Sequence, residues 1–196
     1  MSADHCFFLM DITASMVLAC AAACRARSSG VHFSGAAVLA CVVGMSTPLA
    51  RDCLLGSAVP TLNQGAYLAF VVAGALLAEI FARTRASRKI FFWLDGMGLA
   101  LASGIGAVKA AIWGMGLTGS FLMGLISGLM GGFVRDVALG DLAAFVEESM
   151  YATAAAIGAV VALGVLFYAG LDAWQCALAG SCLALSLRVF FARPCF

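Results

Sequence analysis

Residues 44–57 read GMSTPLARDCLLGS, and residues 128–141 read GLMGGFVRDVALGD. The two segments share a glycine, an Arg-Asp pair and a second glycine at positions that are 84 residues apart. The same offset relates further identical or chemically similar residues: Asp11 and Asp95, Arg25 and Lys109, Gly35 and Gly119, Tyr67 and Tyr151, Gly74 and Gly158. A fixed period without gaps indicates an internal duplication.

The composition places both copies in a membrane. Of the 196 residues, 64% are hydrophobic and only 11% are charged, and the mean hydropathy is +1.06. A soluble domain needs far more charge on its surface, whereas apolar runs of about 20 residues cross a hydrocarbon core of about 30 Å. The sequence therefore predicts an all-α integral membrane protein.

Seven transmembrane helices are expected, in a single transmembrane domain over residues 1–196. Repeat one covers about 6–84, repeat two about 90–168, and a seventh helix without a counterpart about 172–191. The predicted spans are 6–24, 33–56, 61–82, 90–113, 117–139, 147–168 and 172–191. Three spans in each copy force the second copy to enter the bilayer inverted, as in many membrane transport proteins.

Basic residues of the short loops predict the orientation. They gather after the first and third spans and around the C-terminus: Arg25, Arg27, Arg83, Arg85, Arg88, Lys89, Arg188 and Arg193. The alternate loops carry almost none, so we expect the N-terminus outside and the C-terminus in the cytoplasm. Tyr67 and Tyr151 near helix starts, and Trp93, are typical of interfacial aromatic residues.

Charged residues within apolar spans usually face a protein interior or a water-filled cavity. Depths counted along the helices sort them into two neutral layers. The outer layer holds Asp11, Arg51, Asp52 and Lys109, and the inner layer holds Arg25, Asp95, Arg135 and Asp136. Each layer can line one mouth of a polar pathway; the alternatives are salt bridges within the bundle and side chains that snorkel to the interface.

Breaks in the second and fifth helices are expected between the layers. The residues concerned are Gly44, Ser46, Thr47 and Pro48 in the first copy, and Gly128, Met130, Gly131 and Gly132 in the second. Proline removes a backbone donor and paired glycines relax a helix. The freed carbonyls and the hydroxyls of Ser46 and Thr47 suit a passing cation; the alternative is a packing kink without a pore.

The composition gives little support to other functions. The eight cysteines are scattered, and His5 and His32 lie far apart, so no metal site or nucleophile–base pair of an enzyme is indicated. The net charge of +1 does not suggest a nucleic-acid partner. No cofactor is expected beyond a permeant K⁺ or Na⁺.

The segments GLISGLMGGFVRDVALGD (124–141) and ESMYATAAAIGA (148–159) resemble the second-repeat motif of the bacterial trimeric intracellular cation (TRIC) channel family, which also carries the name "glycine transporter". FWLDGMGLALASGIGAVKA (92–110) and MDITASMVLACAAACRA (10–26) resemble the segments before the two motifs. The sequence departs from the family pattern at Ser46-Thr47-Pro48, where three glycines are usual, and at Met130, which replaces the first glycine of the second triplet.

This resemblance implies a homotrimer in the bacterial inner membrane, with a potassium-permeable pore through each protomer at the repeat interface. By the family motif, the pore maps onto Gly44, Ser46, Thr47, Pro48, Arg51, Asp52, Gly128, Met130, Gly131, Gly132, Arg135 and Asp136, with Asp11, Asp95 and Lys109 as supporting charges. The alternative function is a secondary transporter of glycine or a similar small zwitterion, because inverted repeats with broken helices suit alternating access equally well.

Overall fold

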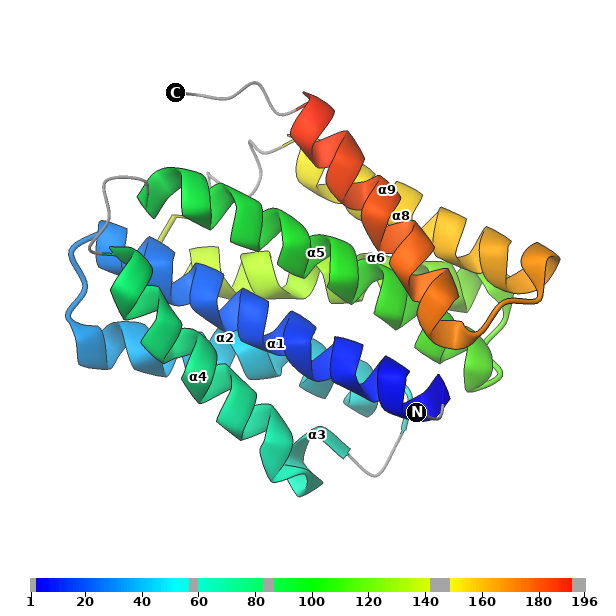
Figure 1. The fold of residues 1–196 in the computed structure, drawn as a ribbon, viewed down its shortest axis with the longest axis horizontal. Coiled ribbons are helices and arrows are strands. Elements are labelled where there is room, and N and C mark those ends of the chain that lie inside the picture. Colours follow the sequence, from blue (N-terminus) through cyan, green and yellow to red (C-terminus); the bar gives the residue numbers. More distant parts are fainter. Residues whose placement is uncertain (1–2, 57–59, 83–86, 142–148, 192–196) are drawn as a thin grey trace.

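The structure, a computed structural model, describes residues 3–56, 60–82, 87–141 and 149–191, and every regular element among them is an α-helix. The helices are α1 (Ala3–Ser28), α2 (Phe33–Leu54), α3 (Pro60–Asn63), α4 (Gly65–Ala82), α5 (Ser87–Ile112), α6 (Leu117–Ala138), α8 (Ser149–Ala169) and α9 (Ala173–Phe191). Figure 1 shows their arrangement in one bundle.

The helices α1 and α5 form the centre of the bundle. They lie side by side and run in opposite directions (Figure 1). More than half of each apolar window is buried, 56% in α1 and 61% in α5, against 33–39% in the other four long spans. Within repeat one α1 packs on α2 and α4, and within repeat two α5 packs on α6 and α8. The central helices are therefore equivalent members of the two repeats.

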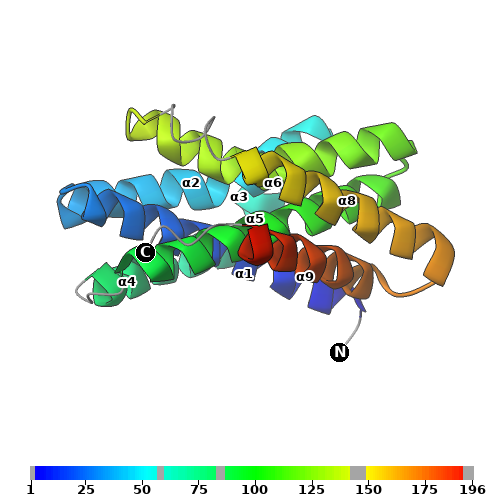
Figure 2. The ribbon, with the colours of Figure 1, turned by 90° about the horizontal axis from the view of Figure 1, so that it is seen from above.

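The repeats meet along two helix pairs, α1 with α5 and α2 with α6. Figure 2 shows α2 and α6 along one side of the central pair. Helix α9, the expected seventh span, packs on α8 and α5 and touches α1. It thus attaches to repeat two and leaves repeat one without an equivalent neighbour.

Six of the helices are long and apolar enough to cross a membrane, and residues 65–81 form a shorter apolar helix. The predicted third span, 61–82, is divided at Gln64 into the short α3 and α4. Asp52 holds α3 as a separate turn, because its carboxylate accepts hydrogen bonds from both the backbone N–H and the hydroxyl of Thr61. The basic residues Arg83, Arg85, Arg88 and Arg193, used for the predicted orientation, have side chains outside the described part of the chain.

The predicted breaks in the second and fifth spans are wrong, because α2 continues through Pro48 and α6 continues through its glycines. A membrane helix tolerates one lost backbone bond where neighbouring helices surround it. In α6 the glycines serve close packing instead. Cβ atoms placed at Gly124, Gly128 and Gly132 would lie 2.4–3.0 Å from side chains of α5 and α8, so one face of α6 approaches its neighbours more closely than any larger residue permits.

The ends of α2 and α6 show that the duplication extends to local geometry. Gly56 and Gly140 both follow a helix end with positive φ, 64° and 71°, a conformation that glycine adopts without strain. Each donates a backbone hydrogen bond to the carbonyl three residues earlier. The two Arg-Asp pairs therefore occupy the same position in the last turns of equivalent helices.

Candidate functional site

A first cluster of polar side chains joins α1, α2, α3, α4 and α5. Its members are Asp11, Arg51, Asp52, Thr61 and Tyr67, which are buried, and Lys109, which is partly buried. Within it, Asp11 is the central acceptor. One oxygen of its carboxylate accepts hydrogen bonds from Arg51 at 2.5 Å and from the hydroxyl of Tyr67 at 2.8 Å. The side chains of Asp11, Arg51 and Tyr67 are all buried, so repeat one carries an ion pair deep within the protein.

The second carboxylate of the first cluster, Asp52, connects the two repeats. It accepts a hydrogen bond from Lys109 of α5 at 3.0 Å and from the hydroxyl of Thr61 at 2.5 Å. The ammonium of Lys109 also lies 3.9 Å from Asp11. The structure thus brings together all four residues of the predicted outer layer, two acids and two bases.

A second cluster, composed of Asp95, Arg135, Asp136, Tyr151 and Arg188, joins α5, α6, α8 and α9. Arg135 donates one hydrogen bond to Asp95 and two to Asp136, at 2.7 and 2.9 Å. Asp95 also accepts bonds from Tyr151 at 3.2 Å and from Arg188 at 2.5 Å. All five residues are buried, so this cluster also pairs two acids with two bases.

The two clusters are equivalent under the duplication, except in one base. Arg25 is the counterpart of Lys109, and we expected it to form a layer with Asp95, Arg135 and Asp136. This prediction is wrong, because the hydrogen bond of the Arg25 side chain goes to a different acid. Arg25 donates to Asp141 at 3.0 Å, with both side chains partly exposed, 35% and 47%. Arg188 is the second base of this cluster instead, and it comes from the helix outside the duplication.

Arg25 nevertheless remains next to the second cluster. Its guanidinium lies 5.8 Å from the ring of Phe91, and that of Arg135 lies 4.9 Å from the same ring. Arg188 stacks over Tyr151 at 4.4 Å. Guanidinium groups are attracted to the faces of aromatic rings, so the aromatic side chains help to hold these cations within the apolar bundle.

Several residues of the clusters were not predicted from the sequence. Tyr67 and Tyr151 were interpreted as interfacial aromatics, but both are buried and donate to the equivalent carboxylates, Asp11 and Asp95. Their equal offset of 56 residues from these acids was the available signal. Thr61 has no such signal, because the residue 84 positions later in the sequence, Phe145, is apolar. Trp93, in contrast, is exposed.

The glycines at positions 44, 128 and 132 contact their own repeats. A Cβ at Gly44 would meet Ala19 and Val71 at 2.9 Å, and one at Gly128 would meet Ala155 and Ser103 at 3.0 Å. Gly132 lies against the ring of Tyr151. These positions permit close packing within a repeat, and the buried Pro48 is the counterpart of Gly132.

Ser46 and its counterpart Met130 are only partly buried. The hydroxyl of Ser46 donates to the carbonyl of Val43 in its own helix at 2.7 Å. Their neighbours Thr47 and Gly131, in contrast, are buried where α2 contacts α6.

Thr47 and Gly131 are counterparts that the fold brings together at the repeat interface. A Cβ at Gly131 would lie 3.4 Å from the hydroxyl oxygen of Thr47. That oxygen is buried and has no hydrogen-bond partner. A buried hydroxyl without a partner is unfavourable, so Thr47 is a predicted pathway residue whose hydroxyl has an unused bonding capacity.

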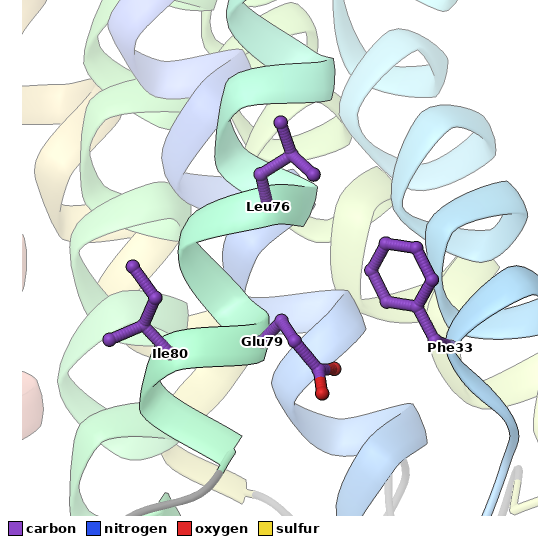
Figure 3. A pocket seen from close by; sticks show the side chains of 4 residues that line it. All are labelled: Phe33, Leu76, Glu79 and Ile80. Atoms are coloured by element: carbon purple, nitrogen blue, oxygen red, sulfur yellow. The ribbon is translucent and has the colours of Figure 1, made fainter.

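Other candidate sites are poorly supported. Among the described residues, no group of three or more His, Cys, Asp or Glu side chains is arranged to hold a metal ion. A groove of about 390 Å³ lies between α2 and α4, lined by Phe33, Leu76, Glu79 and Ile80 (Figure 3). Its walls are mainly apolar, and Glu79 forms an ion pair with Arg27 of α1 at 3.1 Å. The groove contains no residue of either cluster.

The fold and the two clusters define a polytopic α-helical membrane protein built from inverted repeats, which is the architecture of channels and transporters. A solved structure, the TRIC trimeric intracellular cation channel orthologue from Rhodobacter sphaeroides, matches 94% of this chain and 95% of its own, with a TM-score of 0.85 and 25% identity.

Sequence relatives agree with this class. The family model described as "Glycine transporter" matches residues 92–167. A UPF0126 membrane protein of Deinococcus radiodurans is 35% identical over 129 residues, 64% of this chain and 60% of the relative. The UPF0126 inner membrane protein YadS of Escherichia coli strain K12 is 28% identical over 79% of this chain and 76% of its own length. Residues 92–167 thus match the glycine transporter family model, and the chain is an all-helical membrane protein with the fold of prokaryotic TRIC cation channels.

Proposed function

We propose that the protein is a potassium-permeable monovalent cation channel, with a pore through each protomer between the two repeats. The observation that carries this proposal is the pair of buried, formally neutral clusters, with the unpartnered hydroxyl of Thr47 between their levels. On α5, Asp95 and Lys109 belong to opposite clusters and are 14 residues apart, about 21 Å at 1.5 Å per residue. This separation is comparable to most of the hydrocarbon core.

The clusters suit weak, transient cation binding. Carboxylate oxygens are available at both levels, but each is already paired with an internal cation, so a passing ion shares its ligands. Conduction requires sites that bind an ion weakly enough to release it. Between the clusters, Pro48 has no N–H for the carbonyl of Gly44. This carbonyl and the hydroxyl of Thr47 are therefore the oxygen ligands that we assign to the middle of the pathway.

Assembly and location are part of the same proposal. We infer a homotrimer, because the Rhodobacter structure is described as a trimeric channel. We infer the bacterial inner membrane, because the Escherichia coli relative is named an inner membrane protein. The distribution of loop arginines supports an external N-terminus and a cytoplasmic C-terminus.

A secondary transporter of glycine or a similar zwitterion is the second candidate. It is favoured by the description of the family model that matches residues 92–167, and inverted repeats also serve alternating access. The described α2 and α6 are continuous, so they offer no interrupted helix terminus for a substrate carboxylate, and this favours the channel.

Reconstitution distinguishes the two functions. The purified protein is recorded in a planar bilayer under a potassium chloride gradient, and glycine uptake into vesicles is measured in parallel. We expect unitary currents that reverse near the potassium equilibrium potential. Electrical silence together with saturable glycine uptake contradicts the channel and supports the transporter.

A further inference from the structure

Leu18 occupies the midpoint of the central helix α1. It lies seven residues after Asp11 and seven before Arg25. Seven residues are close to two helical turns, so the three side chains share one face of α1, and Leu18 is about 10 Å along the axis from each charged residue. The face that carries an acid at one end and a base at the other thus carries a branched apolar side chain midway between them.

The side chain of Leu18 fills a space that two glycines of repeat two leave open. A Cβ at Gly98 of α5 would lie 2.5 Å from a methyl group of Leu18, and a Cβ at Gly131 of α6 would lie 2.9 Å from the same methyl group. Leu18 is only 2% exposed. It therefore extends from repeat one across the interface to the position where Gly131 meets the hydroxyl of Thr47.

Comparison of the two repeats shows that only repeat one carries a large side chain at the position of Leu18. The counterpart of Leu18 in repeat two is Ala102, which belongs to the same buried apolar cluster as Leu18, Ala22 and Val43. The counterpart of Val43 is Ser127. At these two pairs of positions repeat one thus supplies the larger apolar side chain, and repeat two supplies a small or polar residue.

We propose that Leu18 is the apolar gate of the pathway, closing it midway between the two charged clusters. An apolar constriction too narrow for a hydrated ion excludes water and therefore ions. Movement or removal of the Leu18 side chain leaves a space bordered by Gly98, Ala102, Gly131 and the Thr47 hydroxyl. The proposal rests on the channel function proposed above and adds the residue that controls its opening.

The test compares Leu18→Ala with Leu163→Ala. Leu163 of α8 is also 2% exposed, and it packs with Ala107 and Ala159, away from α1. Both substitutions remove the same atoms from a buried site, so their difference reports position. In planar bilayers we expect Leu18→Ala to raise the open probability at least tenfold above the wild type, and Leu163→Ala to remain within twofold.

The possible results distinguish failure of the gate proposal from failure of the channel proposal. If the wild type conducts potassium and Leu18→Ala opens no more often than Leu163→Ala, the gate is overturned while the channel stands. If neither the wild type nor any variant passes potassium, in bilayers or in vesicle flux, the channel function fails and the gate fails with it. Should Leu18→Ala not yield folded protein, Leu18→Val is used, and an open probability at least threefold above the wild type is expected.

Discussion

Arg188 of α9 donates a 2.5 Å hydrogen bond to the buried carboxylate of Asp95 in α5. Asp95 therefore pairs with two guanidinium groups, because Arg135 contacts its other oxygen. The counterpart Asp11 pairs with Arg51 and with Lys109, a base of the other repeat. Arg188 of α9 thus takes the place in the second cluster that the duplication predicts for Arg25 of repeat one.

Replacement of Arg188 by methionine is expected to lower the stability substantially. The change keeps most of the side-chain volume and leaves part of the Asp95 charge without its partner, which costs about 3–5 kcal/mol for a buried pair. The matched change Arg25→Met removes a partly exposed pair worth about 0–1 kcal/mol. Thermal unfolding in detergent measures both, and equal losses would contradict the structural role given to α9.

Exchange of charges within the first cluster is expected to be tolerated better than a single reversal. Lys109→Asp places a third carboxylate beside Asp52 and Asp11, so we expect little folded protein. Adding Asp52→Lys restores opposite charges at the 3.0 Å contact, and at least half of the wild-type yield should return in size-exclusion chromatography.

The control for this exchange combines Lys109→Asp with Asp136→Lys. Asp136 belongs to the second cluster, which lies about 21 Å away along α5, so no recovery is expected. Rescue by this pair would show that the clusters are not separate electrostatic units.

Replacement of Thr47 by valine tests the midplane ligand. Valine has nearly the same shape, and the hydroxyl that it removes is buried without a partner, so stability should be unchanged or slightly higher. The unitary potassium conductance should fall at least threefold. Thr13→Val, which removes a hydroxyl bonded to the carbonyl of Met10 in α1, serves as the control with unchanged conductance. A Thr47→Val channel with wild-type conductance excludes this hydroxyl as a ligand.

Gly131→Ala is expected to press directly on Leu18. The added methyl group would lie 2.9 Å from Leu18, and overpacking of this kind costs about 1–3 kcal/mol. In the Leu18→Ala background the same Gly131→Ala substitution should cost much less, because the obstructing methyl group is gone. Gly164→Ala is the control, since nothing lies within 4 Å of its Cβ. Additive effects of the two substitutions in thermal unfolding would show that the residues do not meet.

Much of the grouping of charged residues could be predicted from the sequence, because a charged side chain within a membrane span needs an oppositely charged partner at a similar depth. The depth of each residue along its helix follows from the sequence, and this predicted the four charged members of the first cluster and three of the four charged members of the second. The depth does not give the rotation of a helix about its axis. For that reason the burial of Tyr67 and Tyr151, the partner of Arg25 and the contribution of Arg188 were not predicted.

The prediction of breaks in α2 and α6 was wrong for a different reason. Pro48 and the glycines of α6 carry intrinsic preferences against a helix, and these preferences are the only signal in the sequence. In the folded chain, close packing against α5 and α8 uses the glycines at positions 124, 128 and 132 as contact points, so tertiary contacts outweigh local preference.

The sequence by itself determined the membrane class, the duplication and the grouping of most charged residues of the two clusters by level, because hydropathy, period and rise per residue are local properties. Only the tertiary structure decided which side chains meet. The separation of α3 from α4, the place of Arg188 beside Asp95, and the position of Leu18 between Gly98 and Gly131 all depend on how the helices are rotated and how closely they approach. Those quantities arise from the simultaneous packing of many side chains, and no short segment of the chain specifies them.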